Sequence, residues 1–303
     1  MNRARDLAGY GAHPPDVRWP GGAGLALNFV INVEEGSEYS IGDGDGMSES
    51  ALSEVRSSRI SKGDRDLAVE SMYEYGSRVG FWRLLDQFKS RGLPATVFAS
   101  AQALERSPEI AQAIADTGWD ICAHGWRWVE QYKLEPEIER VHIARAYDSI
   151  LNSVGRPPKG WYCRYSPSTA TRGLVVAHGG YAYDSDAYND DIPYWTRVDE
   201  QDHLIVPYTM TMNDTKFLSG DVYTGTDFAS YLINSFDVLH AESAHKPRIM
   251  SVGLHPRIIG HPGRLFGLMQ FMDHVRKAEG VWITGRDQIA EHWRSVVPVK
   301  GAS

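Results

Sequence analysis

Short apolar runs alternate with longer amphipathic stretches from about residue 25 onward. The first run covers residues 25–33 and stops at Glu34-Glu35-Gly36. Further runs that predict strands lie at 95–100, 119–123, 160–163, 181–183, 204–206, 249–254 and 281–283. This alternation is typical of β/α repeats around a parallel sheet.

Helical spacing of apolar residues predicts the connecting helices. They lie near 81–91, 107–118, 135–153, 166–179, 226–240, 263–278 and 286–295. Ser107 and Pro108 supply an N-cap and a first-turn proline for one of them. Residues 37–66 are polar and have no period, so we predict a long loop there that could cover a site.

The whole chain, 1–303, is predicted to be one catalytic domain with its core at about 20–295, because no Pro/Ser/Gly-type linker or tandem repeat divides it. Hydrophobic residues make up 42% and charged residues 23%, which excludes wholesale disorder.

Net charge, apolar runs and cysteine content limit the classes of binding partner and cofactor that we expect. The 31 basic and 39 acidic residues leave a net charge of −8 with no basic cluster, so we expect no nucleic acid partner. No apolar run is long enough to cross a membrane and no signal peptide is recognisable, so we expect a cytoplasmic protein with no membrane partner. Cys122 and Cys163 form neither a disulfide framework nor a zinc motif.

Polar residues gather where the predicted strands end. In a parallel α/β barrel these ends share one rim, where such folds place their chemistry. The residues are Glu34, Glu35, His124, Arg164, Asp184, Asp186, Asn213, Asp214 and His255.

Four of these residues suggest acid–base chemistry. Glu34 and Glu35 can divide labour between polarising water and orienting a partner, although two solvated loop acids are the alternative. His255 leaves an apolar strand and could protonate a leaving nitrogen. His124 is a second imidazole, and four residues later, where a second metal-binding His would stand, the chain has Trp128.

Other motifs carry weaker signals. The fixed fork of Arg164 could hold a carboxylate, a carbonyl or the Glu34/Glu35 pair, or form an ordinary ion pair. Of the acids at 184–191, we select only Asp186 as a site residue. The glycine-rich segment 42–46 lacks the closing Glu of a calcium loop, and 21–24 precedes a strand rather than a helix.

Taken in order, these motifs resemble the polysaccharide deacetylase (NodB-homology) superfamily. They are Val33-Glu-Glu-Gly36, His124-Gly-Trp-Arg-Trp128, the Arg164 to Pro167 turn and Gly253-Leu-His255. Segments such as 70–78, 183–186, 190–193 and 206–209 are similar to the metal-independent allantoinase branch. The resemblance implies a distorted (β/α) barrel, often of seven strands, in a homo-oligomer, with a tetramer expected.

The resemblance also implies roles for the site residues. Glu34 matches the catalytic base, Glu35 and His124 match metal ligands, and Trp128 replaces the second metal-binding His. Arg164 matches the arginine that orients the acid, and His255 matches the late general acid. No cofactor is therefore favoured, and a divalent metal such as zinc, held by Glu35 and His124, is the alternative.

We therefore expect a hydrolase of C–N bonds in a small cyclic amide, such as allantoin or a related hydantoin or imide, in purine catabolism. Glu34 or Glu35 with His124 would position water, Arg164 or a backbone N–H would stabilise the oxyanion, and His255 would protonate the nitrogen. The predicted substrate-binding residues are Trp126, Trp128, Tyr162, Ser166, Asp186 and Asn213. The alternatives are a metal-dependent N-deacetylase of an amino sugar or other N-acyl compound, and a non-catalytic ureide-binding barrel.

Overall fold

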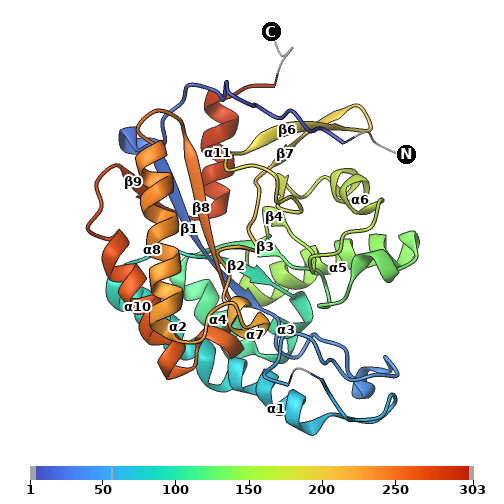
Figure 1. Ribbon diagram of the computed structural model, residues 1–303. Coiled ribbons are helices and arrows are strands. Elements are labelled where there is room, and N and C mark those ends of the chain that lie inside the picture. Colours follow the sequence, from blue (N-terminus) through green and yellow to red (C-terminus); the bar gives the residue numbers. More distant parts are fainter. Residues whose placement is uncertain (1–4, 56, 300–303) are drawn as a thin grey trace.

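One mostly parallel sheet forms the centre of the molecule in the computed structural model, which describes residues 5–55 and 57–299 (Figure 1). Its strands follow the order β6-β7-β5-β4-β3-β2-β1-β8, and β9 pairs with the first residues of β1. The strands are β1 (Leu25–Val33), β2 (Thr96–Ala99), β3 (Asp120–Ala123), β4 (Gly160–Trp161), β5 (Tyr183–Asp184), β6 (Tyr194–Val198), β7 (Gln201–Ile205), β8 (Arg248–Leu254) and β9 (Val281–Ile283).

Helices cover the sheet, with α8 and α10 along one side and α5 and α6 on the other (Figure 1). They are α1 (Leu67–Tyr75), α2 (Phe81–Arg91), α3 (Ala101–Arg106), α4 (Pro108–Thr117), α5 (Pro136–Val154), α6 (Thr171–His178), α7 (Lys216–Ser219), α8 (Gly225–Glu242), α9 (Pro256–Ile259), α10 (Pro262–Val275) and α11 (Arg286–Val296). No helix in the described part of the chain has the length and apolar character needed to cross a membrane.

The predicted fold class, a distorted α/β barrel, is confirmed. Seven strands run parallel along the sheet, as expected for this barrel: β1 to β5, β7 and β8. Two further strands, β6 and β9, were not included in the expected seven. Within residues 5–55 and 57–299 no ladder joins β6 to β8, so the sheet stays open.

Strand β1 is buried along its whole length because it has paired strands on both edges, Phe29 packs on α2 and α10, and Val30 on the other face packs against side chains of neighbouring strands. Its two buried asparagines are satisfied by neighbouring elements: Asn28 Nδ2 donates to Thr96 Oγ1 at 2.9 Å, and Asn32 Nδ2 donates to the Leu254 carbonyl at 3.1 Å. This central strand fixes the position of Glu34 and Glu35, which follow it directly.

Some elements differ from the sequence prediction. The hairpin of β6 and β7 was missed because its two turn residues, Asp199 and Glu200, adopt positive φ (43° and 66°) without the glycine or asparagine that usually signals such a turn. Helix α1 was also missed, and α6 begins at Thr171 rather than beside Pro167. Ser107 precedes α4 as predicted, but its side chain makes no capping bond.

Glycines let α9 approach the π-helical turn at Gly76–Gly80, which joins α1 to α2. A Cβ on Gly80 would lie 2.0 Å from the Pro256 carbonyl oxygen, and one on Gly260 would lie 2.5 Å from the Gly80 Cα. Any larger residue must therefore push α9 away from the turn.

We expect Gly80→Ala to lower the free energy of unfolding by about 1–3 kcal/mol, the usual cost of overpacking. Gly263→Ala is the matched control, because a Cβ at that helical position meets nothing within 4 Å. Urea unfolding followed by circular dichroism measures both. Equal stability of the two variants would contradict the tight contact.

Candidate active site

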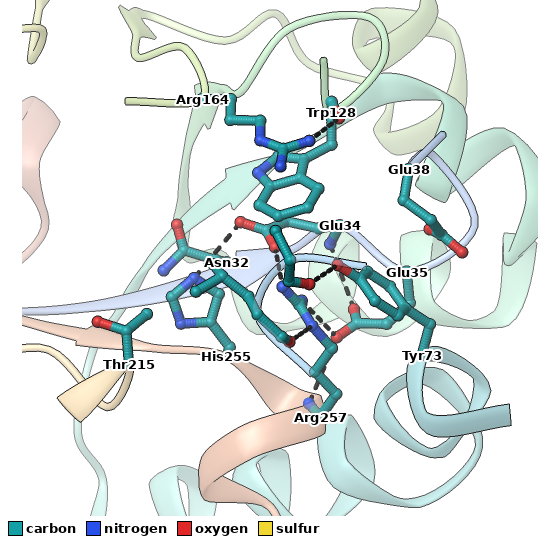
Figure 2. Close-up of polar contacts among 12 residues, drawn as sticks. Asn32, Glu34, Glu35, Glu38, Tyr73, Trp128, Arg164, Thr215, His255 and Arg257 are labelled. Carbon is teal, nitrogen blue, oxygen red and sulfur yellow. Dashed lines mark hydrogen bonds and ion pairs between the residues drawn. The ribbon is translucent and has the colours of Figure 1, made fainter. Parts of the chain in front are cut away.

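The Glu34 carboxylate lies at the centre of a buried cluster of charged side chains from three strand ends (Figure 2). Its Oε1 atom lies 3.0 Å from His124 Nε2 and 3.4 Å from His255 Nε2. Its Oε2 atom lies 2.7 Å from Arg257 Nη2. Glu34 follows β1, His124 follows β3, and His255 and Arg257 follow β8, so the structure brings together residues far apart in the sequence.

The proton on His124 is placed by its backbone partner. His124 Nδ1 lies 3.0 Å from the Tyr162 carbonyl oxygen, which can only accept, so Nδ1 carries a hydrogen. The other ring nitrogen, Nε2, therefore faces Glu34 Oε1, and the bond between them requires one further proton. The hydrogen bond between His124 and Glu34 thus joins two groups, and either of them can donate or accept a proton.

His255 forms a charged pair with Asp214. Its Nδ1 lies 2.6 Å from Asp214 Oδ1, and its backbone N–H donates to Asp214 Oδ2 at 2.6 Å. Burial opposes the imidazolium, but the negative charges of Asp214 and Glu34 outweigh it and raise the pKa of His255 to about 9. His255 is therefore protonated at neutral pH, as a general acid should be.

Glu35 is held apart from the imidazoles. Its Oε1 accepts from the Arg257 backbone N–H and from Nη1, each at 3.3 Å, and its Oε2 accepts from the Glu34 N–H at 3.2 Å. The turn at Gly76 closes over it, since a Cβ there would lie 2.3 Å from Oε1. Burial, together with the charge of Glu34, raises the pKa of Glu35.

Arg257 is the principal site residue that the sequence analysis missed. Its guanidinium is buried between the two glutamates, and its Cζ lies 4.3 Å from the centre of the Tyr73 ring. Burial works against the Glu34 charge, but Arg257, with help from His255 and His124, holds the pKa of Glu34 well below its ordinary value. The only sequence signal was an arginine two residues after a strand-end histidine.

Arg164 does not take the position that the resemblance implied. It donates to Glu49 Oε2 at 2.7 Å and to the Trp128 carbonyl at 3.2 Å, and its Cζ lies 3.7 Å from the Trp128 ring centre. In Figure 2 this ring separates Arg164 from Arg257. Arg257, not Arg164, contacts Glu34 and Glu35, because Glu49 from the loop already pairs with Arg164.

The aromatic residues proposed to bind substrate lie in different places. Tyr162 stacks on His124 with ring centres 5.0 Å apart, and Trp128 is buried beside Tyr73. Trp126 instead packs towards α5, where the Arg145 Cζ lies 3.5 Å from its ring centre. The ring contacts of Trp126 are with Arg145 and His142 of α5, and its role in substrate binding stays a prediction.

The polar residues proposed to bind substrate make their own local contacts. Asn213 is buried and donates from Nδ2 to the Tyr208 hydroxyl at 3.4 Å. Asp186 Oδ1 accepts from the Cys163 N–H, and burial with the Asp184 charge raises the pKa of Asp186 to about 7. Ser166 is half-buried in its turn. None of these three side chains forms a hydrogen bond or ion pair with Glu34 within the described residues.

The polar segment 37–66 lies against the arginine side of the site. It contains a short 3₁₀ turn, Ile41–Asp43, and its Leu52 carbonyl accepts from Arg257 Nε at 3.2 Å. Its acids pair with arginines outside the segment: Asp43 with Arg106 (2.5 Å), Asp45 with Arg127 (2.6 Å), Glu49 with Arg164 (2.7 Å) and Glu54 with Arg264 (2.6 Å).

The residues present do not fit a divalent metal. Trp128 stands where the resemblance requires the second histidine, and the Arg257 guanidinium already contacts both glutamates. In the part of the chain that the structure describes, no three His, Cys, Asp or Glu side chains are arranged to hold a metal ion.

Several known proteins are similar to this chain in sequence and structure. A family model described as polysaccharide deacetylase matches residues 62–183. A Schizosaccharomyces pombe protein, provisionally named a polysaccharide deacetylase, is 36% identical and covers 99% of this chain and 100% of its own. The crystal structure of PuuE allantoinase is 43% identical, with a TM-score of 0.95, and covers 99% of this chain and 100% of its own.

A provisionally named polysaccharide deacetylase from Pseudomonas aeruginosa PAO1 is also 43% identical, with a TM-score of 0.94, over 98% of this chain and 100% of its own. An α/β barrel with a buried acid–imidazole cluster at its strand ends, similar throughout to these proteins, defines a hydrolase of the deacetylase and allantoinase type. The chain belongs to the polysaccharide deacetylase family, so the predicted resemblance is confirmed.

We expect Asp214→Asn to lower the pKa of His255 from about 9, because burial then acts with less opposing charge. An NMR titration of the imidazole measures this shift. Asp237→Asn is the control, since Asp237 pairs with the exposed His274. An unchanged His255 titration in Asp214→Asn would contradict the pairing.

The same pair links stability to pH. Folding raises the pKa of His255 above its ordinary 6.5, so its contribution is complete below about pH 6.5 and is lost as the pH rises through about 9. We therefore expect the free energy of unfolding to fall less between pH 6 and pH 10 in Asp214→Asn than in the wild type, as measured by urea unfolding.

Proposed function

We propose that the chain hydrolyses a C–N bond of a small cyclic amide, such as allantoin or a related hydantoin or imide. One observation carries this proposal: the Glu34 carboxylate lies between two imidazoles, and Asp214 keeps one of them, His255, protonated. The likeness to PuuE allantoinase along the whole chain supports the substrate class.

In the first step, a water molecule attacks the amide carbonyl carbon. Glu34, with His124, takes a proton from the water as the new C–O bond forms, and the carbonyl π electrons move to the oxygen. A negative charge then develops on that oxygen, which needs a donor or a cation beside it.

In the second step, the C–N bond breaks and His255 gives its Nε2 proton to the departing nitrogen. Asp214 stabilises the imidazolium before this transfer and keeps Nδ1 protonated throughout. The ring opens to a carboxylic acid and an amine or urea nitrogen on the same molecule. The proton taken from water then returns to the imidazole or to solvent.

A metal-dependent N-deacetylase is the second candidate, because the family and two of the similar proteins carry the deacetylase name. A panel of hydantoin, allantoin, succinimide and N-acetylglucosamine oligomers, assayed with and without a chelator, separates the candidates. We expect ring opening that the chelator does not change. Turnover of N-acetyl sugars alone, abolished by the chelator, would overturn the proposal, and binding without turnover would favour a non-catalytic barrel.

The predicted homo-oligomer, cytoplasmic location and role in purine catabolism belong to the same proposal. So do the predicted roles of Tyr162, Trp128 and Asn213 in binding the substrate.

We expect Glu34→Gln to lower kcat about 100-fold or more, since general base catalysis contributes about 10²–10⁴-fold. Glu35→Gln should lower it less, because Glu35 has no imidazole contact. Glu74→Gln on the surface of α1 is the control and should keep wild-type kinetics. A Glu34→Gln variant that is folded and within threefold of wild-type kcat would refute this role.

A further inference from the structure

Two buried polar atoms in the site have no hydrogen-bond partner in the described residues: Glu34 Oε2 and Arg257 Nη2. They form an ion pair with each other at 2.7 Å, although not in hydrogen-bond geometry, and neither makes a hydrogen bond to another described residue. A carboxylate oxygen and a guanidinium nitrogen with unfilled hydrogen-bonding capacity therefore lie side by side in a site from which water is largely excluded. Buried groups of this kind are costly unless a ligand satisfies them.

The guanidinium of Arg257 is held rigidly by its other nitrogens. Nε donates to the Leu52 carbonyl at 3.2 Å and Nη1 donates to Glu35 Oε1 at 3.3 Å. The rings of Tyr73 and Trp128 lie against it, with centres 4.3 Å and 5.2 Å from Cζ. Figure 2 shows Arg257 beside Glu34, Glu35 and Tyr73; of its three nitrogens, Nη2 is the one without a hydrogen bond to the described residues.

Arg257 contacts two of the positions that the resemblance assigns to metal binding. The resemblance assigns Glu35 and the position of Trp128 to metal binding, and Arg257 contacts Glu35 and the ring of Trp128. A guanidinium is a permanent cation, with a pKa that its neighbours raise further here despite burial. It can therefore neutralise the acid pair without any bound ion.

We propose that Arg257 is the built-in cation of this site: it occupies the position that a divalent metal would need, and its free Nη2–H binds the carbonyl oxygen on which negative charge develops. This inference rests on the proposed amide hydrolysis. Glu34 Oε2, the neighbouring free acceptor, would then hold the attacking water. No proton leaves Arg257 in either step, because it acts only as a donor and a charge.

This arrangement couples the two atoms. When Nη2 donates to the substrate oxygen, its charge is shared between that oxygen and Glu34, so the Glu34 carboxylate is stabilised less. Glu34 then becomes a better base at the moment when the water must be deprotonated.

The first test needs no substrate. Protein stripped with a chelator is titrated with Co²⁺ and followed by visible absorbance and calorimetry. We expect no stoichiometric binding by the wild type, and one site per chain in the double variant Trp128→His/Arg257→Gln. Stoichiometric Co²⁺ binding at this site by the wild type, or none by the folded double variant, would overturn the claim that Arg257 occupies a cation position.

The second test measures kinetics on whichever amide the wild type turns over. We expect Arg257→Lys to lower kcat about 100- to 1,000-fold, the usual cost of removing one oxyanion donor, with a smaller change in KM. A lysine keeps the charge and so protects the fold, which thermal unfolding checks. Arg264→Lys, at an arginine that pairs with Glu54 on the surface, is the control.

A kcat of folded Arg257→Lys within threefold of the wild type would refute the oxyanion role. The two proposals fail separately. If the wild type cleaves only N-acyl compounds, the cyclic amide proposal is wrong, but the same variants still test the oxyanion role of Arg257. If no amide is cleaved, the proposed function and the oxyanion role are both wrong. The Co²⁺ titration then tests by itself whether Arg257 occupies a cation position.

Discussion

The charge of the buried Glu34 carboxylate is the constraint on which the rest of the site depends. A carboxylate that is 1% exposed costs several kcal/mol to bury unless cations and donors surround it. Arg257, His124 and His255 meet this requirement, and they come from the ends of β3 and β8 on either side of β1. The strand order of the sheet therefore determines the chemistry, since no two of these strands are consecutive in the chain.

Residues around this cluster compensate the charges of the groups that contact Glu34. Asp214 compensates His255, Glu35 contacts Arg257, and the Leu52 carbonyl from segment 37–66 holds the same guanidinium. Positive and negative groups alternate through the cluster, so each depends on its neighbour for its charged state. The Arg257 guanidinium suits such a cluster, because this cation is part of the chain and its position is set by folding.

Sequence reasoning succeeded where a residue follows an apolar run. Glu34, His124 and His255 were placed at strand ends, and parallel strands bring such ends together whatever their distance along the chain. It could not give the direction of a side chain. Trp126 follows the same strand end as His124 but contacts Arg145, and Arg164 pairs with Glu49, one of the alternatives that the sequence left open, because no local pattern identifies such partners. The β6–β7 hairpin was missed for a related reason, since Asp199 and Glu200 carry no turn signature.

The sequence by itself determined the α/β class, the alternation of strands and helices, and the acid and imidazole residues at the rim. Burial requires apolar residues at regular spacing in strands and helices, and the polar residues that follow a buried strand mark its end. Only the tertiary structure decided that Glu34 rather than Glu35 meets both imidazoles, that Asp214 pairs with His255, and that Arg257 lies between the glutamates. These contacts join residues up to 223 positions apart, between Glu34 and Arg257, and depend on side-chain direction, which one-dimensional periodicity does not encode.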